Sequence, residues 1–274
     1  TAQLRAARRI GARTVFVSSR PGKRWTAFRW RWLAALDAHW IAYPAFLAGE
    51  LSWWERSKLR LRPGVSVTFL GTVFAEPDEE RRAEFLRSLD VEEDRYVLLA
   101  PGGGGAHRRG PAALDAFVRA AREIAAVTGL RAVLVLGPAH RGELPAIDGV
   151  RVLGGVASSD MIALVGGARV AVLNGGSTLT QALALGRACV ATAIADDQTE
   201  RVRRCAALGL IEVSALDAAS LSARANRLAT DDSTRDDLQR RVREAGLHNG
   251  LEFAIDGLEA LLDAGPPASN GARP

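Results

Sequence analysis

The sequence predicts an α/β protein whose strands form parallel sheets. Short apolar runs alternate with segments of helical periodicity along most of the 274 residues, which is typical of repeated βα units. Glycine-rich turns directly follow two of the apolar runs, at Gly102 and at Gly175. Apolar residues make up 48% of the chain and charged residues 24%, which are ordinary values for a globular protein with a buried core.

Two domains and a tail are expected from length and composition. A chain of 274 residues is longer than one average domain. The acidic stretch Glu76–Glu80, which contains Pro77, has the composition of a linker. We therefore expect a first domain over residues 1–75 and a second over residues 76–263. Residues 264–274 are rich in Gly, Pro, Ala and Ser and are expected to be disordered.

Hydrophobic periodicity places the individual elements. In the first domain it predicts a helix over residues 26–39 and strands over residues 13–18, 40–43 and 65–74. In the second domain it predicts strands over residues 96–100, 132–136, 150–153, 170–173 and 188–192. Helices are expected there over residues 111–128, 159–166, 177–185 and 200–208, with three more between residues 216 and 262.

Several classes of protein do not fit the sequence. No apolar run approaches the roughly 18 to 20 residues of a transmembrane helix, and neither a Gly-x-Ser-x-Gly elbow nor a Walker loop occurs. The four histidines have no metal-ligand spacing, and His39, in an apolar segment, is expected to be packed. Cys189 and Cys205 are expected to be buried thiols, which suits a reducing compartment.

Positive charge and tryptophan are concentrated near the beginning of the chain. Residues 1–70 hold 13 Lys and Arg against 3 Asp and Glu, a net charge of +10, so that the remainder carries −5. All six tryptophans lie between Trp25 and Trp54. This mixture suits an anionic membrane surface, a phosphate-bearing acceptor or nucleic acid. The alternative is a solvated basic face with the tryptophans packed beneath it.

The first glycine turn has the pattern of a phosphate-binding loop. A predicted strand over residues 96–100 is followed by Pro101, by glycines at 102–105 and then by a helix. Glycine lets backbone N–H groups approach an anion at a helix N-terminus, whereas a merely flexible turn does not require four glycines. The next residues either add positive charge to this loop or are ordinary surface side chains: His107, Arg108 and Arg109.

The second glycine turn repeats this arrangement. Gly175 and Gly176 separate a predicted strand from a helix that begins with Ser177 and Thr178. The two hydroxyls suit either a helix cap or a phosphate ligand. Because turns at the carboxyl ends of strands in one parallel sheet converge on a single crevice, the two glycine turns together favour one shared phosphate site.

Residues 96–213 resemble the C-terminal domain of GT-B glycosyltransferases, most closely the UDP-N-acetylglucosamine transferase of peptidoglycan lipid II synthesis. That family has a glycine loop after the first strand of the domain. Its donor motif runs Gly, small, any, Thr, any, Ser/Thr, Glu, and then Gly. The sequence here reads Gly175, Gly176, Ser177, Thr178, Leu179, Thr180, Gln181, and then Gly186. The resemblance implies a Rossmann-like GT-B architecture with one complete parallel-sheet donor domain and a partial N-terminal α/β domain.

The resemblance also assigns roles to single residues. Gln181 stands where the family has the acidic residue that holds the ribose hydroxyls, so that hydrogen bonds remain but the charge is lost. Asp197 and Gln198 match a pair near the donor sugar, and Arg201 stands where relatives have Asn. The implied donor-binding residues are Gly102, Gly103, Gly104, Gly105, Gly175, Gly176, Ser177, Thr178, Gln181, Asp197 and Gln198.

The first domain resembles, more loosely, the end of the family's N-terminal domain. Pro21-Gly22 matches a loop before a helix, and Pro44 matches the proline that ends a strand. This implies that roughly the first hundred residues of the enzyme lie upstream of Thr1, among them its first glycine loop and its general base. No catalytic residue is therefore assigned, and this chain is expected to be incomplete for catalysis. The family is metal-independent, and the paired aspartates at 196–197 and 231–232 lack an Asp-x-Asp spacing.

Taken together, the resemblance implies transfer of a sugar from a nucleotide-sugar, expected to be UDP-linked, to an acceptor hydroxyl without a metal or a cofactor. A nucleotide-sugar hydrolase or epimerase of the same fold is an alternative, as is a non-catalytic donor-binding subunit. The expected partners are the nucleotide-sugar and either a lipid-linked acceptor or an anionic membrane surface, with no nucleic acid. The expected location is the cytoplasm, including the inner face of the membrane.

Overall fold

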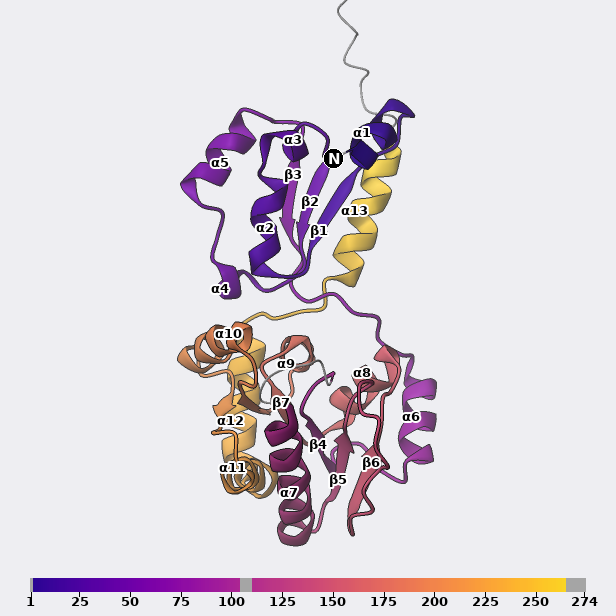
Figure 1. Ribbon diagram of the computed structural model, residues 1–274, viewed down its shortest axis with the longest axis vertical. Coiled ribbons are helices and arrows are strands. Elements are labelled where there is room, and N and C mark those ends of the chain that lie inside the picture. The colour runs from indigo at the N-terminus through magenta and orange to yellow at the C-terminus, as the bar shows by residue number, and fades with distance from the viewer. Residues whose placement is uncertain (1, 104–109, 265–274) are drawn as a thin grey trace, which may run out of the picture. The chain divides into compact units, whose positions relative to one another are not determined.

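The computed structural model describes residues 2–103 and 110–264, which form two compact units (Figure 1). Unit 1 comprises Thr1–Phe74 and Asn249–Pro274, and unit 2 comprises Ala75–His248. Within the described residues, unit 1 contains a three-stranded sheet and unit 2 a six-stranded sheet. The strands of both sheets pair in parallel. The predicted α/β class with parallel sheets is confirmed.

Unit 1 has the strand order β1 (Val15–Ser18), β2 (Ala38–Ile41) and β3 (Ser66–Phe69). Its helices are α1 (Ala2–Arg9), α2 (Pro21–Ala27), α3 (Trp30–Leu33), α4 (Ala45–Ala48), α5 (Trp53–Arg60) and α13 (Leu251–Asp263). Successive side chains of a strand face opposite sides of the sheet. One side packs Phe16 with Phe28 and Leu33 of the α2–α3 region, and the other packs Trp40 and Leu70 against α13.

The prediction of a single helix over residues 26–39 is wrong. Two short helices form instead, separated at Arg29, whose backbone is extended with φ −71° and ψ 133°. The chain turns before β2 because the buried carboxylate of Asp37 accepts hydrogen bonds from the backbone N–H and the hydroxyl of Thr14, at 2.7 and 2.9 Å. These bonds to a residue 23 positions earlier hold Asp37 beside β1 and out of a helix.

Helix α13 packs with unit 1, which differs from the second domain expected over residues 76–263. The chain rejoins unit 1 at Asn249, whose side chain accepts from the backbone N–H of Phe74 at 3.2 Å and donates to its carbonyl at 2.7 Å. Gly257 of α13 lies so close to Trp40 that a Cβ there would stand 2.9 Å from the indole ring. Most of the expected tail, residues 265–274, lies outside the described residues.

Unit 2 has the strand order β6-β5-β4-β7-β8-β9. These strands are β4 (Tyr96–Ala100), β5 (Arg131–Val135), β6 (Val150–Leu153), β7 (Val170–Asn174), β8 (Cys189–Thr192) and β9 (Glu212–Val213). The helices are α6 (Glu79–Ser88), α7 (Gly110–Thr128), α8 (Ser158–Gly167), α9 (Ser177–Ala184), α10 (Asp196–Ala207), α11 (Ala218–Thr230) and α12 (Asp232–Glu244). A core that includes Phe117 of α7 and Leu221 of α11 covers one face of this sheet.

The strand order of unit 2 reverses between β4 and β7. From β4 the chain continues outward through β5 and β6, and from β7 it continues in the other direction through β8 and β9. Because both neighbouring strands are parallel, the connections that leave their carboxyl ends part at this point. A crevice forms at such a reversal, and it is where open α/β sheets bind their ligands.

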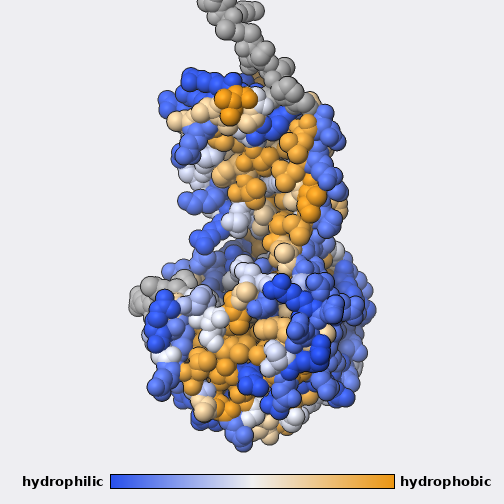
Figure 2. Space-filling model, turned by 90° about the vertical axis from the view of Figure 1, so that its right-hand side faces the viewer, coloured by the Kyte–Doolittle hydropathy of each residue, from blue (hydrophilic) through white to orange (hydrophobic). Residues whose placement is uncertain are grey.

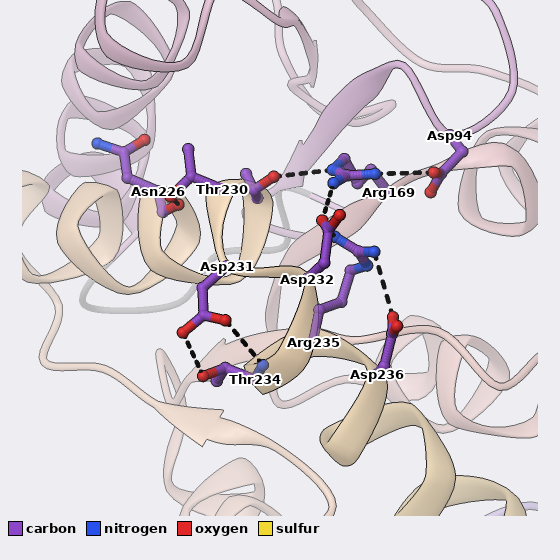
Figure 3. Close-up of polar contacts among 10 residues, drawn as sticks. Asp94, Arg169, Asn226, Thr230, Asp231, Asp232, Thr234, Arg235 and Asp236 are labelled. Atoms are coloured by element: carbon purple, nitrogen blue, oxygen red, sulfur yellow. Dashed lines mark hydrogen bonds and ion pairs between the residues drawn. The ribbon is translucent and has the colours of Figure 1, made fainter.

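The opposite, amino-terminal ends of β4 and β7 are joined by an ion-pair network (Figure 3). Arg169, which precedes β7, donates to the Asp94 carboxylate and to the Ala229 carbonyl, each at 2.8 Å, and also pairs with Asp232. Arg235 of α12 reaches the same Asp232 carboxylate at 2.7 Å. The network connects α11 and α12 to the amino-terminal end of the sheet. The glycine turns lie at the opposite, carboxyl ends of the strands.

Unit 1 exposes apolar side chains on the face shown in Figure 2, where orange residues extend over its surface. Val17 of the edge strand β1 is exposed, as are Ile255, Leu258 and Leu262 of α13. Among the helices that the structure describes, none combines the length and the apolar character of a transmembrane span.

Candidate functional site

Two glycine turns meet at the carboxyl ends of β4 and β7. Gly102 follows β4 with a φ of +110°, and a Cβ at this position would lie 2.2 Å from Nδ2 of Asn174, the last residue of β7. Both the left-handed backbone and this close approach require glycine. The convergence expected from the sequence is therefore present in the structure.

Asn174 is the side chain that connects the two turns. It is buried, and its Oδ1 accepts a hydrogen bond from the backbone N–H of Gly176 at 3.1 Å. A Cβ at Gly176 would lie 2.8 Å from the same oxygen. Asn174 was not predicted as a site residue, although its position between a buried strand and two glycines was a usable signal.

The turn that follows β5 also contacts the first glycine turn. A Cβ at Gly137 would lie 2.5 Å from the carbonyl oxygen of Gly102 and 3.1 Å from the Cα of Gly103. Gly103 itself is exposed, and a Cβ there would have no heavy atom within 4 Å. The ends of β4, β5 and β7 therefore meet at Gly102 and Gly103, and the space beside Gly103 is open among the described residues. The periodicity of the sequence does not indicate the contribution of Gly137.

Helix α9 begins at this position without a side-chain cap. Its N-cap residue is Gly176, and the N-cap makes no side-chain hydrogen bond. Ser177 and Thr178 are the first two helical residues, and Ser177 is exposed. The helix-cap alternative for the two hydroxyls therefore does not hold. The first turn of α9 carries backbone N–H groups and the positive end of the helix dipole, which attract an anion.

Helix α10 packs directly against the second glycine turn. A Cβ at Gly175 would lie 2.7 Å from a methyl carbon of Val202 and 2.9 Å from the Cβ of Gln198. Arg201 donates a hydrogen bond to the carbonyl of Gly175. Arg201, where relatives have Asn, thus contacts the backbone of the turn itself.

The remaining predicted residues lie around this turn in different environments. Gln181 is half-buried on α9, and Asp197 is exposed in the first turn of α10. Gln198 is buried, and its Oε1 accepts from the backbone N–H of Ile194 at 3.1 Å. The side-chain amide oxygen of Gln198 therefore holds the loop between β8 and α10. Gly104, Gly105, His107, Arg108 and Arg109 lie outside the described residues.

Neither cysteine belongs to the site. Cys189 and Cys205 are buried free thiols, as expected. Burial raises the pKa of both thiols, that of Cys205 to about 11, so both are neutral at physiological pH. Within residues 2–103 and 110–264, no group of three or more His, Cys, Asp or Glu side chains is arranged to share a metal ion.

A second polar cluster lies beside β1 and β2 of unit 1. His39 is packed, as expected, but on strand β2, where its ring lies between Phe16 and Phe28 and its Nε2 is 3.0 Å from the Ser18 hydroxyl. Burial, followed by the charge of Arg24, lowers the pKa of His39 to about 4. His39 is therefore neutral near pH 7.

Arg24 and Glu55 form a nearly buried ion pair next to this cluster. The guanidinium of Arg24 donates to both carboxylate oxygens of Glu55, at 3.1 and 2.6 Å. Burial alone would raise the pKa of Glu55, but hydrogen bonds from Arg24 and Ser52 and the charge of Arg24 hold this pKa below its usual value. The pair joins α2 to α5.

No protein-family model and no curated protein matches this chain, but solved structures are similar to it. The structure described as the glycotransferase of kitacinnamycin has a TM-score of 0.57 at 18% identity, over 97% of this chain and 74% of that one. The spinosyn forosaminyltransferase SpnP has a TM-score of 0.60 at 16% identity, over 95% of this chain and 73% of that one.

An epimerase and a plant enzyme extend the comparison. The putative UDP-N-acetylglucosamine 2-epimerase from Listeria monocytogenes has a TM-score of 0.60 at 15% identity, over 95% of this chain and 70% of that one. UGT2 of Phytolacca americana, complexed with UDP-2fluoro-glucose and pterostilbene, has a TM-score of 0.55 at 12% identity, over 84% of this chain and 54% of that one. The chain therefore has the Rossmann-like α/β fold of GT-B glycosyltransferases, a fold that it shares with an epimerase.

Proposed function

We propose that unit 2 binds the diphosphate of a nucleotide-sugar and that the protein transfers the sugar to an acceptor hydroxyl. The observation that carries this proposal is the meeting of two glycine turns through Asn174, beside the uncapped first turn of α9. Backbone N–H groups and a helix dipole directed at one open position suit a diphosphate. The similar fold of solved glycosyltransferases supports the reading.

The chemical task in such a transfer is to stabilise the negative charge on the departing diphosphate. The proposed reaction is metal-independent, so that this charge is met by fixed donors on the protein. The N–H groups of the first turn of α9 and the backbone of Gly102 and Gly103 are the proposed donors. Such donors need no reorganisation as the charge develops, because the turns are held by Asn174 and by α10.

Separate roles are proposed for the side chains around the turns. Ser177 and Thr178 contact the diphosphate, Gln181 the ribose hydroxyls, and Asp197 the hydroxyls of the donor sugar. Gln198 positions the loop before α10 through its hydrogen bond with Ile194. UDP-N-acetylglucosamine is the first donor to test, because the glycine motif resembles that of the lipid II enzyme and because a similar structure was solved with a UDP-sugar.

A nucleotide-sugar epimerase or hydrolase is the second candidate. The epimerase from Listeria monocytogenes has the same fold at a TM-score of 0.60, so the fold alone does not distinguish the reactions. Incubation of the protein, including any natural sequence upstream of Thr1, with UDP-N-acetylglucosamine, with and without an acceptor alcohol, separates them. Release of UDP that depends on the acceptor supports transfer, and release or epimerisation without it supports the second candidate.

Calorimetric titration with UDP tests the donor site itself. We expect saturable binding of one UDP per chain, and binding at least about tenfold weaker in Gly103→Ala, because a methyl group would fill the open position beside the turn and a tenfold loss corresponds to about 1.4 kcal/mol. Gly22→Ala is the control, since a Cβ at Gly22 also has no atom within 4 Å and lies in unit 1. Equal affinity of the Gly103 variant and the original chain contradicts a diphosphate at this turn.

A further inference from the structure

Four tryptophans of unit 1 are exposed to an extent unusual for this residue. Trp25 is 54% exposed, Trp30 49%, Trp53 66% and Trp54 69%. Tryptophan is normally highly buried, because its large apolar ring gains most from leaving water. The four indoles lie on α2, α3 and α5, which pack on the same side of the unit 1 sheet. We call them the tryptophan face.

Basic side chains are interleaved with these indoles. The guanidinium of Arg29 lies 3.8 Å from the centre of the Trp25 ring, and Nζ of Lys58 lies 5.7 Å from that of Trp30. Seven basic residues of this region form no ion pair with an acidic residue in the part of the chain that the structure describes: Arg20, Lys23, Arg29, Arg31, Lys58, Arg60 and Arg62.

The acidic residues of the same region do not offset this charge. Glu55 is committed to Arg24, Asp37 pairs with Arg13, and Glu50 pairs with Arg56. The ion pair between Arg24 and Glu55 and the capping box of Ser52 and Glu55 also fix the start of α5 relative to α2. The indoles and the cations are therefore presented by packed helices.

We propose that the tryptophan face binds an anionic lipid bilayer. Indole rings favour the interface between headgroups and acyl chains, and unpaired basic side chains attract anionic headgroups. Each property alone has another explanation, but exposed indoles together with an excess of cations are complementary to a surface that is both apolar and negatively charged. This partner goes beyond the proposed sugar transfer and does not depend on it.

The tryptophan face is distinct from the other exposed apolar surface of unit 1. Ile255 and Leu258 of α13 belong to the opposite side of the sheet, where Trp40 and Leu70 pack. Neither α13 nor β1 contains a tryptophan, and the exposed tryptophans lie on α2, α3 and α5. A protein segment that covered α13 would leave the tryptophan face accessible.

Binding of the full chain to vesicles tests this proposal. The probes are vesicles of phosphatidylcholine alone and vesicles that also contain phosphatidylglycerol, read by co-sedimentation and by tryptophan emission. We expect binding to the anionic vesicles only, with a blue shift of the emission, and loss of binding at high salt as surface charges are screened. Binding that is equal on both kinds of vesicle, or absent on both at low salt, overturns the proposal.

Variants identify the residues responsible. Changing Arg29, Arg31, Arg60 and Arg62 to Glu is expected to weaken binding roughly 100-fold or more, because each basic residue near an anionic surface strengthens binding about fivefold. Changing the same residues to Lys should preserve it. The control reverses the same number of charges on exposed residues of unit 2, Arg81, Arg122, Arg241 and Arg243, and should retain at least most of the binding. A charge-reversed tryptophan face that binds as tightly as this control contradicts the proposal.

The indoles have their own test. The double variant Trp53→Ala, Trp54→Ala removes the most exposed pair and is expected to weaken binding at least about tenfold, since each ring carries a large apolar area. Val127→Ala with Leu208→Ala is the control, because both side chains are exposed apolar residues of unit 2. Unchanged affinity of the tryptophan variant shows that the indoles take no part and overturns their role.

Discussion

At the scale of single residues, Asn174 and Gly102 determine how the two turns of unit 2 fit together. The Asn174 side chain accepts from Gly176 on its own turn and fills the space above Gly102 on the other. The amide is buried, so its hydrogen bond is worth more than a solvated one and its loss leaves polar atoms unpaired. The two turns therefore approach closely because the Asn174 side chain lies between them and because Gly102 has no side chain in its way.

Gly102→Ala is expected to lower the free energy of unfolding by about 1–3 kcal/mol, because alanine is strained at a φ of +110° and its Cβ would collide with Asn174. Gly103→Ala is the matched control in the same turn. It should change stability by less than about 0.5 kcal/mol, since a Cβ there meets no atom within 4 Å. Chemical denaturation measures both values. Equal stability of the two variants would show that the turns are not packed as described.

His39 makes the stability of unit 1 depend on pH. Its pKa in the folded protein is about 4, below the 6.5 of an unfolded chain, so the unfolded state binds more protons between these values and stability falls as the pH falls through this window. We expect the protein to be about 2 kcal/mol less stable at pH 5 than at pH 7 through this residue. His39→Gln, compared by denaturation at the two pH values, should lose most of this difference. An undiminished difference would assign it to another group.

At the scale of elements, strands were predictable where they are buried on both sides and helices where their periodicity is long. The predicted strand over residues 96–100 coincides with β4, and the predicted helix over residues 111–128 nearly coincides with α7. The prediction of one helix over residues 26–39 was wrong because the apolar positions of this segment suit both a helix and the start of β2. The carboxylate of Asp37, bonded to Thr14 in a distant part of the sequence, decided between them.

Docking of α13 on unit 1 depends on close backbone contact at Gly250. A Cβ at this residue would stand 1.7 Å from the carbonyl oxygen of Leu70, so Gly250→Ala has to displace the chain. We expect a loss of about 2–4 kcal/mol in stability, with faster hydrogen exchange in α13. Gly154→Ala, whose nearest atom would be 3.8 Å away, is the control. Unchanged exchange in α13 would contradict this mode of docking.

At the scale of the whole molecule, the fold class and the glycine turns could be predicted, because both depend on patterns local in the sequence. The sheet of unit 2 brings Gly102, Gly137 and Asn174 together, although they are dispersed in the chain. Gly137 and Asn174 were therefore missed, as was the return of α13 to unit 1. Such contacts depend on strand order, which periodicity does not reveal.

The net charge is distributed unevenly along the whole chain. Residues 1–70 carry a net charge of +10 and the remainder −5. The basic part coincides with the tryptophan face of unit 1, whereas the described residues of the proposed diphosphate site in unit 2 offer backbone donors and a helix dipole. The two proposed partners, a bilayer and a nucleotide-sugar, are therefore met by different chemistry in different units.

The most direct test of the donor site is a crystal structure of the chain grown with UDP. We predict density for the diphosphate at hydrogen-bonding distance from the backbone N–H groups of Ser177 and Thr178, beside Gly103. In crystals of Gly103→Ala grown at the same UDP concentration, the occupancy of the diphosphate should be lower, in line with the expected loss of about tenfold or more in affinity. A diphosphate bound elsewhere on the protein, or no bound UDP at millimolar concentration, would show that the glycine turns and the first turn of α9 do not form a nucleotide-sugar site.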